Sequence, residues 1–172
     1  MCSHCIARAP SFDSTLTLAD YVTPVSGMVG ALKCSARLDL ADMFGRLLAT
    51  REPLLREADL VLAVPPSHER ESVHGFNQSR EIAKRYARLA GIALWDGILL
   101  RVRHMAPQQS LAREARQRNV RGAFVVTGDV RGQRVVVVDD VMTTDSPLVE
   151  IASVLKRART ARVMKRLVAR TP

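Results

Sequence analysis

The chain has 172 residues, 47% of them hydrophobic and 25% charged, and its 26 Lys and Arg against 17 Asp and Glu give a net charge of +9. A chain of this length and composition can bury a substantial core in one domain, which excludes an intrinsically disordered protein. The basic excess excludes an acidic calcium buffer and indicates anionic partners, either phosphorylated small molecules or nucleic acid. Only 4% of the residues are aromatic, which is few for a surface that binds single-stranded nucleic acid by stacking aromatic side chains on its bases.

The basic excess lies in the last two thirds of the chain. Residues 1–60 hold six basic and seven acidic residues, residues 61–133 hold twelve and six, and residues 134–172 hold eight and four. The densest stretch, 101–121, has six arginines and one acid. Such a run is typical of a solvated helix face as much as of an anion-binding surface.

No apolar stretch approaches the roughly 20 residues that cross a bilayer, so we expect no membrane insertion. The first residues lack the apolar segment of a secretion signal. Three cysteines are too few, and odd in number, for a disulfide scaffold. We therefore expect a cytoplasmic protein with reduced thiols.

Apolar periodicity predicts an alternation of helices and strands. The first half of the chain is predicted to form a helix over 38–50, a strand that starts at 60 and ends at the prolines 65–66, and a helix over 77–90 that ends at Gly91. The second half is predicted to form strands over 98–102 and 123–127, a valine strand over 135–140, a helix over 147–158 and a strand over 161–169. The predicted inward stripes are Leu40, Met43, Phe44, Leu47 and Leu48 on the first helix, Ile82, Ala83, Tyr86, Ala87 and Leu89 on the second, and Leu148, Ile151, Ala152 and Leu155 on the third. Asn77 and Ser146 are the expected N-caps of the second and third helices, and Pro147 suits the first helical turn.

This alternation predicts an α/β fold with an open, mostly parallel sheet flanked by helices. Unbroken β-branched runs such as the valines at 135–138 are typical of parallel strands that are covered on both faces. We expect one domain over 1–172. In open α/β sheets, ligands bind beyond the carboxyl ends of the strands and near helix N-termini.

The valine strand is followed at that edge by a run of acids and hydroxyls, from Asp139 to Ser146. Adjacent carboxylates can accept hydrogen bonds from the vicinal hydroxyls of a ribose. Thr143, Thr144 and Ser146 offer hydroxyl donors, and the loop with the helix start offers backbone N–H groups for a phosphate.

An apolar strand, two acids and a threonine-rich loop resemble the fingerprint of the type I phosphoribosyltransferases. The resemblance implies a type I phosphoribosyltransferase-like fold that binds phosphoribosyl pyrophosphate, with Asp139 and Asp140 as catalytic residues. It further implies a ribose-phosphate site made of Asp139, Asp140, Thr143, Thr144, Asp145 and Ser146. Magnesium would accompany the ligand and bind through the ligand's oxygens and water.

Further segments resemble the competence protein F family in unbroken order: residues 21–33, 63–70, 75–78, 101–103, 108–111, 118–124 and 167–170. Members of that family are phosphoribosyltransferase-like proteins, some of them needed for DNA uptake. The resemblance divides the chain into residues 1–33, a remnant of an N-terminal zinc-knuckle region, and residues 34–172, the α/β core.

Two positions depart from the phosphate loop of the phosphoribosyltransferases. Asp145 replaces a glycine, and Pro147 replaces a threonine, which removes a hydroxyl and a backbone donor. Two unit charges about 4 Å apart repel by roughly 1 kcal/mol in water and roughly 4 kcal/mol at a semi-buried site. Our hypothesis is that the Asp145 carboxylate occupies the helix N-terminus where phosphate would bind, which lowers phosphate affinity by about one to three decades and puts turnover in doubt.

The N-terminal cysteines resemble half of the family's zinc knuckle. Cys2, His4 and Cys5 are three candidate ligands, whereas a structural zinc site needs four, and His4 is poorly placed in so short a hairpin. We therefore expect no zinc site. Cys34 stands where the family has an aromatic residue, which predicts a small buried side chain.

A pyrophosphate group in this fold is held by the loop after the first strand of the core and by a basic flap. Arginine suits this role because its guanidinium contacts phosphate oxygens in pairs. The candidates are Ser67 and Arg70 in the loop, and Arg101, Arg103, Arg116 and Arg118 in the flap.

Two functions remain open at this point. One is a phosphoribosyltransferase, a glycosyltransferase that uses magnesium and phosphoribosyl pyrophosphate. The other is a non-catalytic accessory protein of competence that binds single-stranded DNA or a protein of the competence machinery through its basic face. The sequence leaves open whether the chain forms a homo-oligomer.

Overall fold

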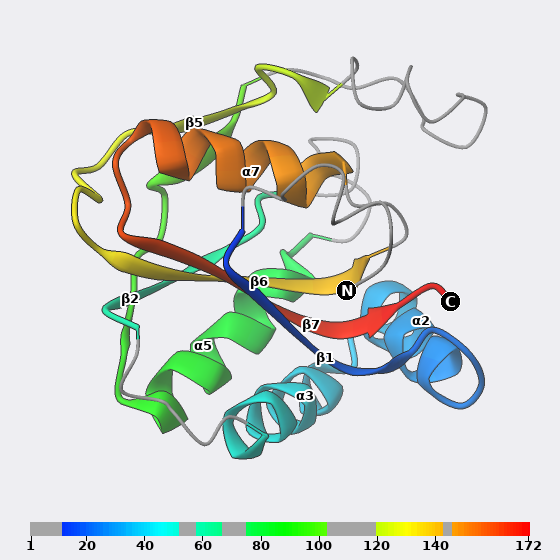
Figure 1. Ribbon diagram of the computed structural model, residues 1–172. Helices are drawn as coiled ribbons and strands as arrows, with labels where there is room; N and C mark the ends of the chain where they lie inside the picture. Colours follow the sequence, from blue (N-terminus) through cyan, green and yellow to red (C-terminus); the bar gives the residue numbers. More distant parts are fainter. Residues whose placement is uncertain (1–11, 52–57, 67–74, 103–119, 143–145) are drawn as a thin grey trace.

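The computed structural model describes residues 12–51, 58–66, 75–102, 120–142 and 146–172. A sheet of five parallel strands forms its centre, with helices on both faces (Figure 1). The strands, in their order across the sheet, are β1 (Ser14–Asp20), β7 (Arg162–Arg170), β6 (Arg134–Met142), β2 (Leu60–Ala63) and β3 (Ala93–Leu94). The described helices are α2 (Val25–Ser35), α3 (Leu38–Thr50), α5 (Gln78–Ala90) and α7 (Ser146–Arg157). The predicted open, mostly parallel α/β sheet is confirmed.

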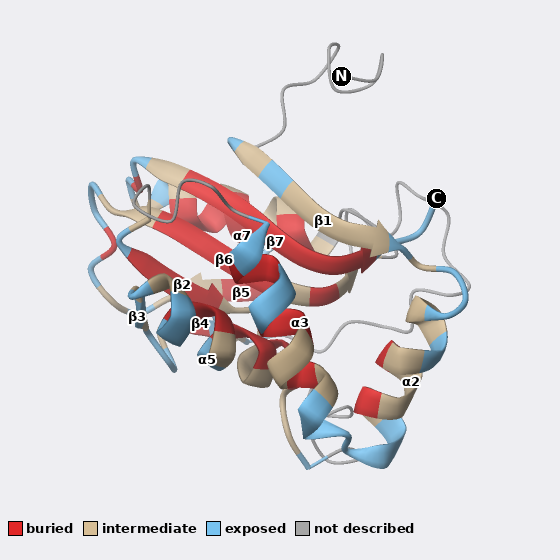
Figure 2. Ribbon diagram, turned by 90° about the horizontal axis from the view of Figure 1, so that it is seen from below, coloured by how far each residue is buried: buried red, intermediate tan, exposed pale blue. Residues whose placement is uncertain are grey.

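The valine run in β6 explains why helices cover both faces of the sheet. Val136 and Val138 pack into a core with side chains of α3 and α5, whereas Val135 and Val137 pack into a second core with side chains of α7. All four valines are at most 1% exposed. Figure 2 shows the central strands as the buried interior of the molecule, between α7 on one face and α3 and α5 on the other.

The second predicted helix, α5, has the predicted ends. Asn77 caps its start through a hydrogen bond from the backbone N–H of Arg80, and Gly91 ends it in the left-handed conformation, with φ of 68°. Its neighbour α3 approaches closely at Gly45, where an added Cβ would lie 2.6 Å from Arg85 Cβ and 2.8 Å from the carbonyl oxygen of Ile82. The absence of a side chain at Gly45 therefore sets the distance between the two helices.

The predicted strands over 98–102 and 123–127 form, but they lie outside the main sheet. β4 (Leu99–Arg101) and β5 (Phe124–Val126) pair with each other as an antiparallel ribbon. Leu99 and Phe124 belong to the same core as the buried side of α7. The ribbon is therefore an addition on the α7 face of the sheet.

Several details of the sequence prediction are wrong. Leu47 and Leu89, expected to face inward, are 42% and 43% exposed, because each lies at the border of its helix's buried stripe. Cys34, expected to be buried, is exposed near the end of α2. The third helix begins at Ser146 itself rather than after it. The prediction also lacks β1, α2 and the two-residue β3.

Residues 12–33 contribute to the same layers as the rest of the described chain. β1 pairs with β7 along its length, and Val29 and Leu32 of α2 are fully buried in the core with α3. In the described part of the chain, none of the helices combines the length and the hydrophobicity that a membrane crossing requires.

Candidate functional site

The carboxyl ends of β2 and β6 meet at one edge of the sheet, where the strand order reverses. From β2 the chain continues through α5 to β3 on one side, and from β6 it continues through α7 to β7 on the other side. Such a reversal point in an open α/β sheet leaves a crevice beyond the strand ends, and ligands bind there. In Figure 1 this edge lies on the right, where β6 and β7 end beside α2.

Asp139 lies half-buried at this edge, and one oxygen of its carboxyl group accepts two hydrogen bonds. Ser79 Oγ donates to Asp139 Oδ1 over 2.8 Å, and the backbone N–H of Asp140 donates to the same oxygen over 2.9 Å. Burial, followed by the negative charge of Asp140, raises the pKa of Asp139 from 3.8 to about 7, against the opposing effects of these hydrogen bonds and of Lys33. The side chain can therefore exchange a proton near neutral pH, as a general acid or base must.

Asp140 is buried and forms an ion pair with a helix from the beginning of the chain. Its Oδ2 lies 2.7 Å from Nζ of Lys33 in α2, and its Oδ1 accepts the backbone N–H of Val141 over 2.6 Å. A buried carboxylate is costly unless a charge and hydrogen bonds compensate it. Lys33 therefore fixes α2 against the strand that bears both acids.

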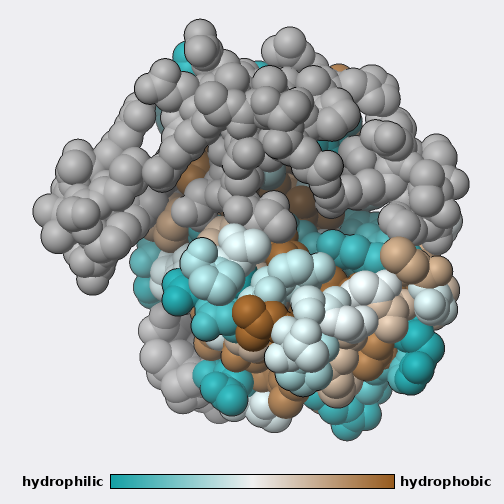
Figure 3. Space-filling model, turned by 90° about the vertical axis from the view of Figure 1, so that its right-hand side faces the viewer, coloured by the Kyte–Doolittle hydropathy of each residue, from teal (hydrophilic) through white to brown (hydrophobic). Residues whose placement is uncertain are grey.

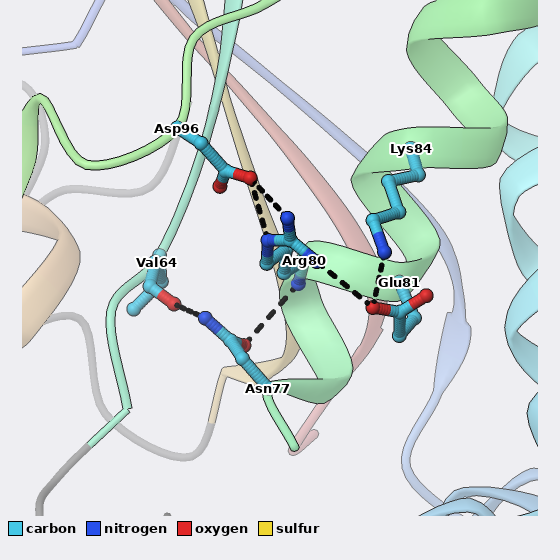
Figure 4. Close-up of polar contacts among 6 residues, drawn as sticks. All are labelled: Val64, Asn77, Arg80, Glu81, Lys84 and Asp96. Carbon is cyan, nitrogen blue, oxygen red and sulfur yellow. Dashed lines mark hydrogen bonds and ion pairs between the residues drawn. The ribbon is translucent and has the colours of Figure 1, made fainter.

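Asn77 connects the start of α5 with the end of β2 (Figure 4). Its Nδ2 donates to the carbonyl oxygen of Val64 over 3.0 Å, while its Oδ1 accepts the backbone N–H of Arg80 over 3.2 Å. One amide thus caps the helix and holds the segment that leaves β2. This contact gives the segment 75–78 a structural role at the edge of the sheet.

The charged groups beside this cap neutralise one another. Arg80 Nε donates to Asp96 Oδ2 over 2.6 Å, and Arg80 also forms an ion pair with Glu81 at 3.3 Å. Lys84 Nζ lies 2.8 Å from the same Glu81 oxygen (Figure 4). These two bases are engaged with acids on the outer surface of α5.

Strand β7, next to β6, carries two buried basic side chains. Lys165 and Arg166 are 1% and 3% exposed. Lys165 Nζ lies 3.4 Å from the centroid of the Phe12 ring and 3.8 Å from Met142 Sδ at the end of β6. Arg166 donates to the carbonyl oxygen of Lys165 over 2.8 Å. Positive charge is therefore buried inside the sheet beside the strand of the two acids.

The structure describes only part of the predicted site. Asp139 and Asp140 lie at the predicted edge. Arg101 lies on β4, where its Cζ is 5.5 Å from the centroid of the Phe124 ring. Ser146 is the first residue of α7, although its side chain is not described. The other predicted residues lie outside the described ranges: Thr143, Thr144, Asp145, Ser67, Arg70, Arg103, Arg116 and Arg118, and with them the candidate zinc ligands Cys2, His4 and Cys5.

The structure adds Lys33 and Ser79 to the site, and the sequence analysis missed both. Ser79 had a detectable signal, because it is a polar residue on the inward stripe of the predicted helix over 77–90. Lys33 had none, because only the packing of α2 brings it to a strand that lies more than a hundred residues later in the chain.

Figure 3 views the molecule from the side at which β7 and α2 end, and the described surface there mixes hydrophilic and hydrophobic residues. Among the described residues, no group of three or more His, Cys, Asp or Glu side chains could hold a metal ion.

No family model matches the chain. The DNA utilization protein YhgH of Escherichia coli strain K12 is 34% identical over 177 residues, which cover 99% of this chain and 78% of that protein. The protein of the same name from Salmonella typhimurium strain LT2 is 35% identical with the same coverage. Competence protein F of Haemophilus influenzae is 29% identical over 165 residues, which cover 91% of this chain and 72% of that protein.

Solved structures agree with the architecture. Glutamine phosphoribosylpyrophosphate amidotransferase from B. subtilis, complexed with ADP and GMP, matches 74% of this chain with 26% identity and a TM-score of 0.52. The match covers a quarter of the amidotransferase chain, 25%. The fold is therefore that of the type I phosphoribosyltransferases. With relatives 34% to 35% identical over nearly its whole length, the chain belongs to the family of the DNA utilization protein YhgH and competence protein F.

Proposed function

We propose that the chain binds phosphoribosyl pyrophosphate, or a related phosphorylated ribose, at the edge where β2 and β6 end. The observation that carries the proposal is the pair Asp139 and Asp140 at the reversal point of a parallel sheet, with Asp139 titrating near neutral pH. In this arrangement the Asp139 carboxylate accepts hydrogen bonds from ribose hydroxyls, while Lys33 and Ser79 hold the two acids in place.

The loop after β6 would hold the 5-phosphate through Thr143, Thr144 and the N-terminus of α7. Asp145 and Pro147 alter this loop, so we propose binding without assuming turnover. If transfer occurs, the chain acts as a phosphoribosyltransferase, and its residues act mainly by positioning the ligand and neutralising charge. Magnesium, bound through the ligand and water, would neutralise part of the pyrophosphate charge.

Isothermal titration with phosphoribosyl pyrophosphate and magnesium tests this proposal. We expect binding by the wild type and a loss of about tenfold or more in Asp139→Asn, because an amide accepts ribose hydroxyls less strongly than a carboxylate. Asp145→Gly should bind more tightly than the wild type, since it removes a negative charge from the phosphate loop. Wild-type protein that shows no heat of binding at millimolar ligand would refute the proposal.

A second candidate is an accessory role in competence through nucleic acid binding. The names of the relatives, DNA utilization protein and competence protein F, favour it. The described structure also places exposed Arg131, Arg157 and Arg159 around the end of α7, at the sheet edge opposite Asp139, where the N–H of Gly132 donates to the carbonyl of Arg159. These three arginines could contact the phosphates of single-stranded DNA.

Fluorescence anisotropy with a labelled single-stranded oligonucleotide separates the two candidates. Phosphate-driven binding should weaken steeply with salt, and replacing Arg131, Arg157 and Arg159 by alanine should flatten that dependence. The same triple variant should leave titration with phosphoribosyl pyrophosphate unchanged, because the substitutions lie at the other end of the strands. DNA affinity that does not change in the triple variant would contradict this surface.

A further inference from the structure

Gln78, the first residue of α5, carries a buried amide nitrogen that has no hydrogen-bond partner among the residues that the structure describes. The residue is 7% exposed, and its Nε2 is shielded from solvent. An amide nitrogen that is buried without an acceptor destabilises a fold, because it loses its hydrogen bonds to water. Such a group in a folded protein calls for an explanation, and a ligand that supplies the acceptor is one.

The position of Gln78 indicates which ligand this would be. Gln78 lies one turn before Ile82 on the side of α5 that packs against the sheet, in the turn of the helix that is next to the carboxyl ends of β2 and β6. The next residue, Ser79, donates to Asp139, and the preceding residue, Asn77, donates to the carbonyl of Val64 at the end of β2. Gln78 therefore lies between two residues that make contacts at this edge. Ser79 contacts Asp139, the proposed ribose-binding acid, and Asn77 contacts the segment that leaves β2.

The start of α5 also favours negative charge. The first backbone N–H groups of a helix lack intrahelical acceptors, and the helix dipole is positive at this end. The Asn77 side chain accepts from Arg80 N, which is the third residue of the helix. The first turn of α5 therefore contains the backbone N–H groups of Gln78 and Ser79 and the side-chain amide of Gln78.

We propose that Gln78 Nε2 donates a hydrogen bond to a pyrophosphate oxygen of the ligand, together with the N-terminus of α5. This inference rests on the proposed binding of phosphoribosyl pyrophosphate and adds a residue to that site. Gln78 is a binding residue, and its amide lowers the stability of the free protein because it gains its acceptor only when the ligand binds.

Gln78→Met tests the inference, because methionine matches glutamine in length and helix propensity but has no donor. Loss of one hydrogen bond to a charged oxygen should weaken binding of phosphoribosyl pyrophosphate and of magnesium pyrophosphate by between about tenfold and about a hundredfold. Binding of ribose 5-phosphate, which lacks the pyrophosphate, should stay within about twofold. The melting temperature of the free variant should equal or exceed that of the wild type. Gln133→Met is the matched control, since Gln133 precedes β6 at the opposite end of the strand from Asp139.

Each other outcome overturns the inference in a recognisable way. Wild-type protein that binds none of the three compounds refutes the proposed function and the inference together. Equal binding by wild type and Gln78→Met refutes the inference alone. An equal loss of ribose 5-phosphate binding would show that the amide does not contact pyrophosphate. A lower melting temperature in Gln78→Met would show that the amide stabilises the fold, which contradicts a group reserved for a ligand.

Discussion

Replacing Asp139 by asparagine should stabilise the protein at high pH and leave it unchanged at low pH. Asparagine resembles the protonated carboxyl group, and its oxygen can still accept the hydrogen bonds from Ser79 Oγ and from the Asp140 N–H. Burial and the adjacent Asp140 charge raise the pKa of Asp139 from 3.8 to about 7, so the folded state holds a proton that the unfolded chain has lost. Wild-type stability should therefore fall as the pH rises from about 4 to about 7 and level off above that range.

The size of the effect follows from the same shift. A pKa difference of roughly three units corresponds to about 4 kcal/mol as an upper limit, and relaxation around the charge reduces this to about 2–4 kcal/mol. Asp139→Asn should thus match the wild type at pH 4 within about 1 kcal/mol and exceed it by about 2–4 kcal/mol at pH 9.

Urea unfolding at several pH values, followed by the fluorescence of the single tryptophan, Trp95, measures this difference. The chain has four histidines, a residue type that ordinarily changes charge in this pH range, so the difference between variant and wild type is the quantity to follow. Asp129→Asn, which removes an exposed carboxyl group, is the control for the loss of a charge as such. A difference between Asp139→Asn and wild type that is the same at pH 4 and pH 9 would refute the reasoning.

Three further predictions concern packing and the supports of the site. Gly45→Ala should destabilise the fold by about 1–3 kcal/mol in thermal unfolding, because its Cβ meets α5 at 2.6–2.8 Å. Gly30→Ala, in a helix with nothing within 4 Å of the added atom, should instead stabilise it by about 0.5–1 kcal/mol, and the same sign in both variants would contradict this account. Lys33→Met should lower the free energy of unfolding by about 2–4 kcal/mol, because it leaves the buried Asp140 carboxylate without its ion-pair partner. Adding Asp140→Asn should restore most of that free energy in a double-mutant cycle. Losses that simply add in the double variant would show that the ion pair does not form. Asn77→Ala should cost about 1 kcal/mol through the lost cap of α5 and should accelerate amide hydrogen exchange in the first turn of that helix, whereas unchanged exchange would argue against the cap.

The core of the fold could be predicted from the sequence because its signals are local. Four consecutive valines specify a strand with two covered faces, and two acids at their end mark the carboxyl edge of that strand. Asn77 begins a helix through its side-chain cap, and Gly91 ends the same helix through its left-handed backbone conformation. Each of these features depends on residues within a few positions of one another.

The elements that the sequence did not predict depend on contacts that are distant along the chain. Helix α2 contains Gly27 and Gly30 and buries only Val29 and Leu32, so its periodicity is weak before it packs. Strand β1 is an edge strand whose exposed and half-buried residues give little contrast. The ion pair of Lys33 with Asp140 forms only when α2 packs at the end of the sheet, and no local pattern specifies that packing.

The position of β7 has a consequence for how the protein forms during synthesis. β7 lies between β1 and β6, and Ser14 pairs with Met164, 150 positions later. Until β7 emerges from the ribosome, β1 has no strand to pair with, and one side of β6 exposes unpaired backbone groups. Contacts that close over such distances slow folding, and open strand edges promote aggregation. We expect a chain that stops before residue 162 to aggregate during translation, because the strand bearing both acids is paired on both sides only once β7 is present.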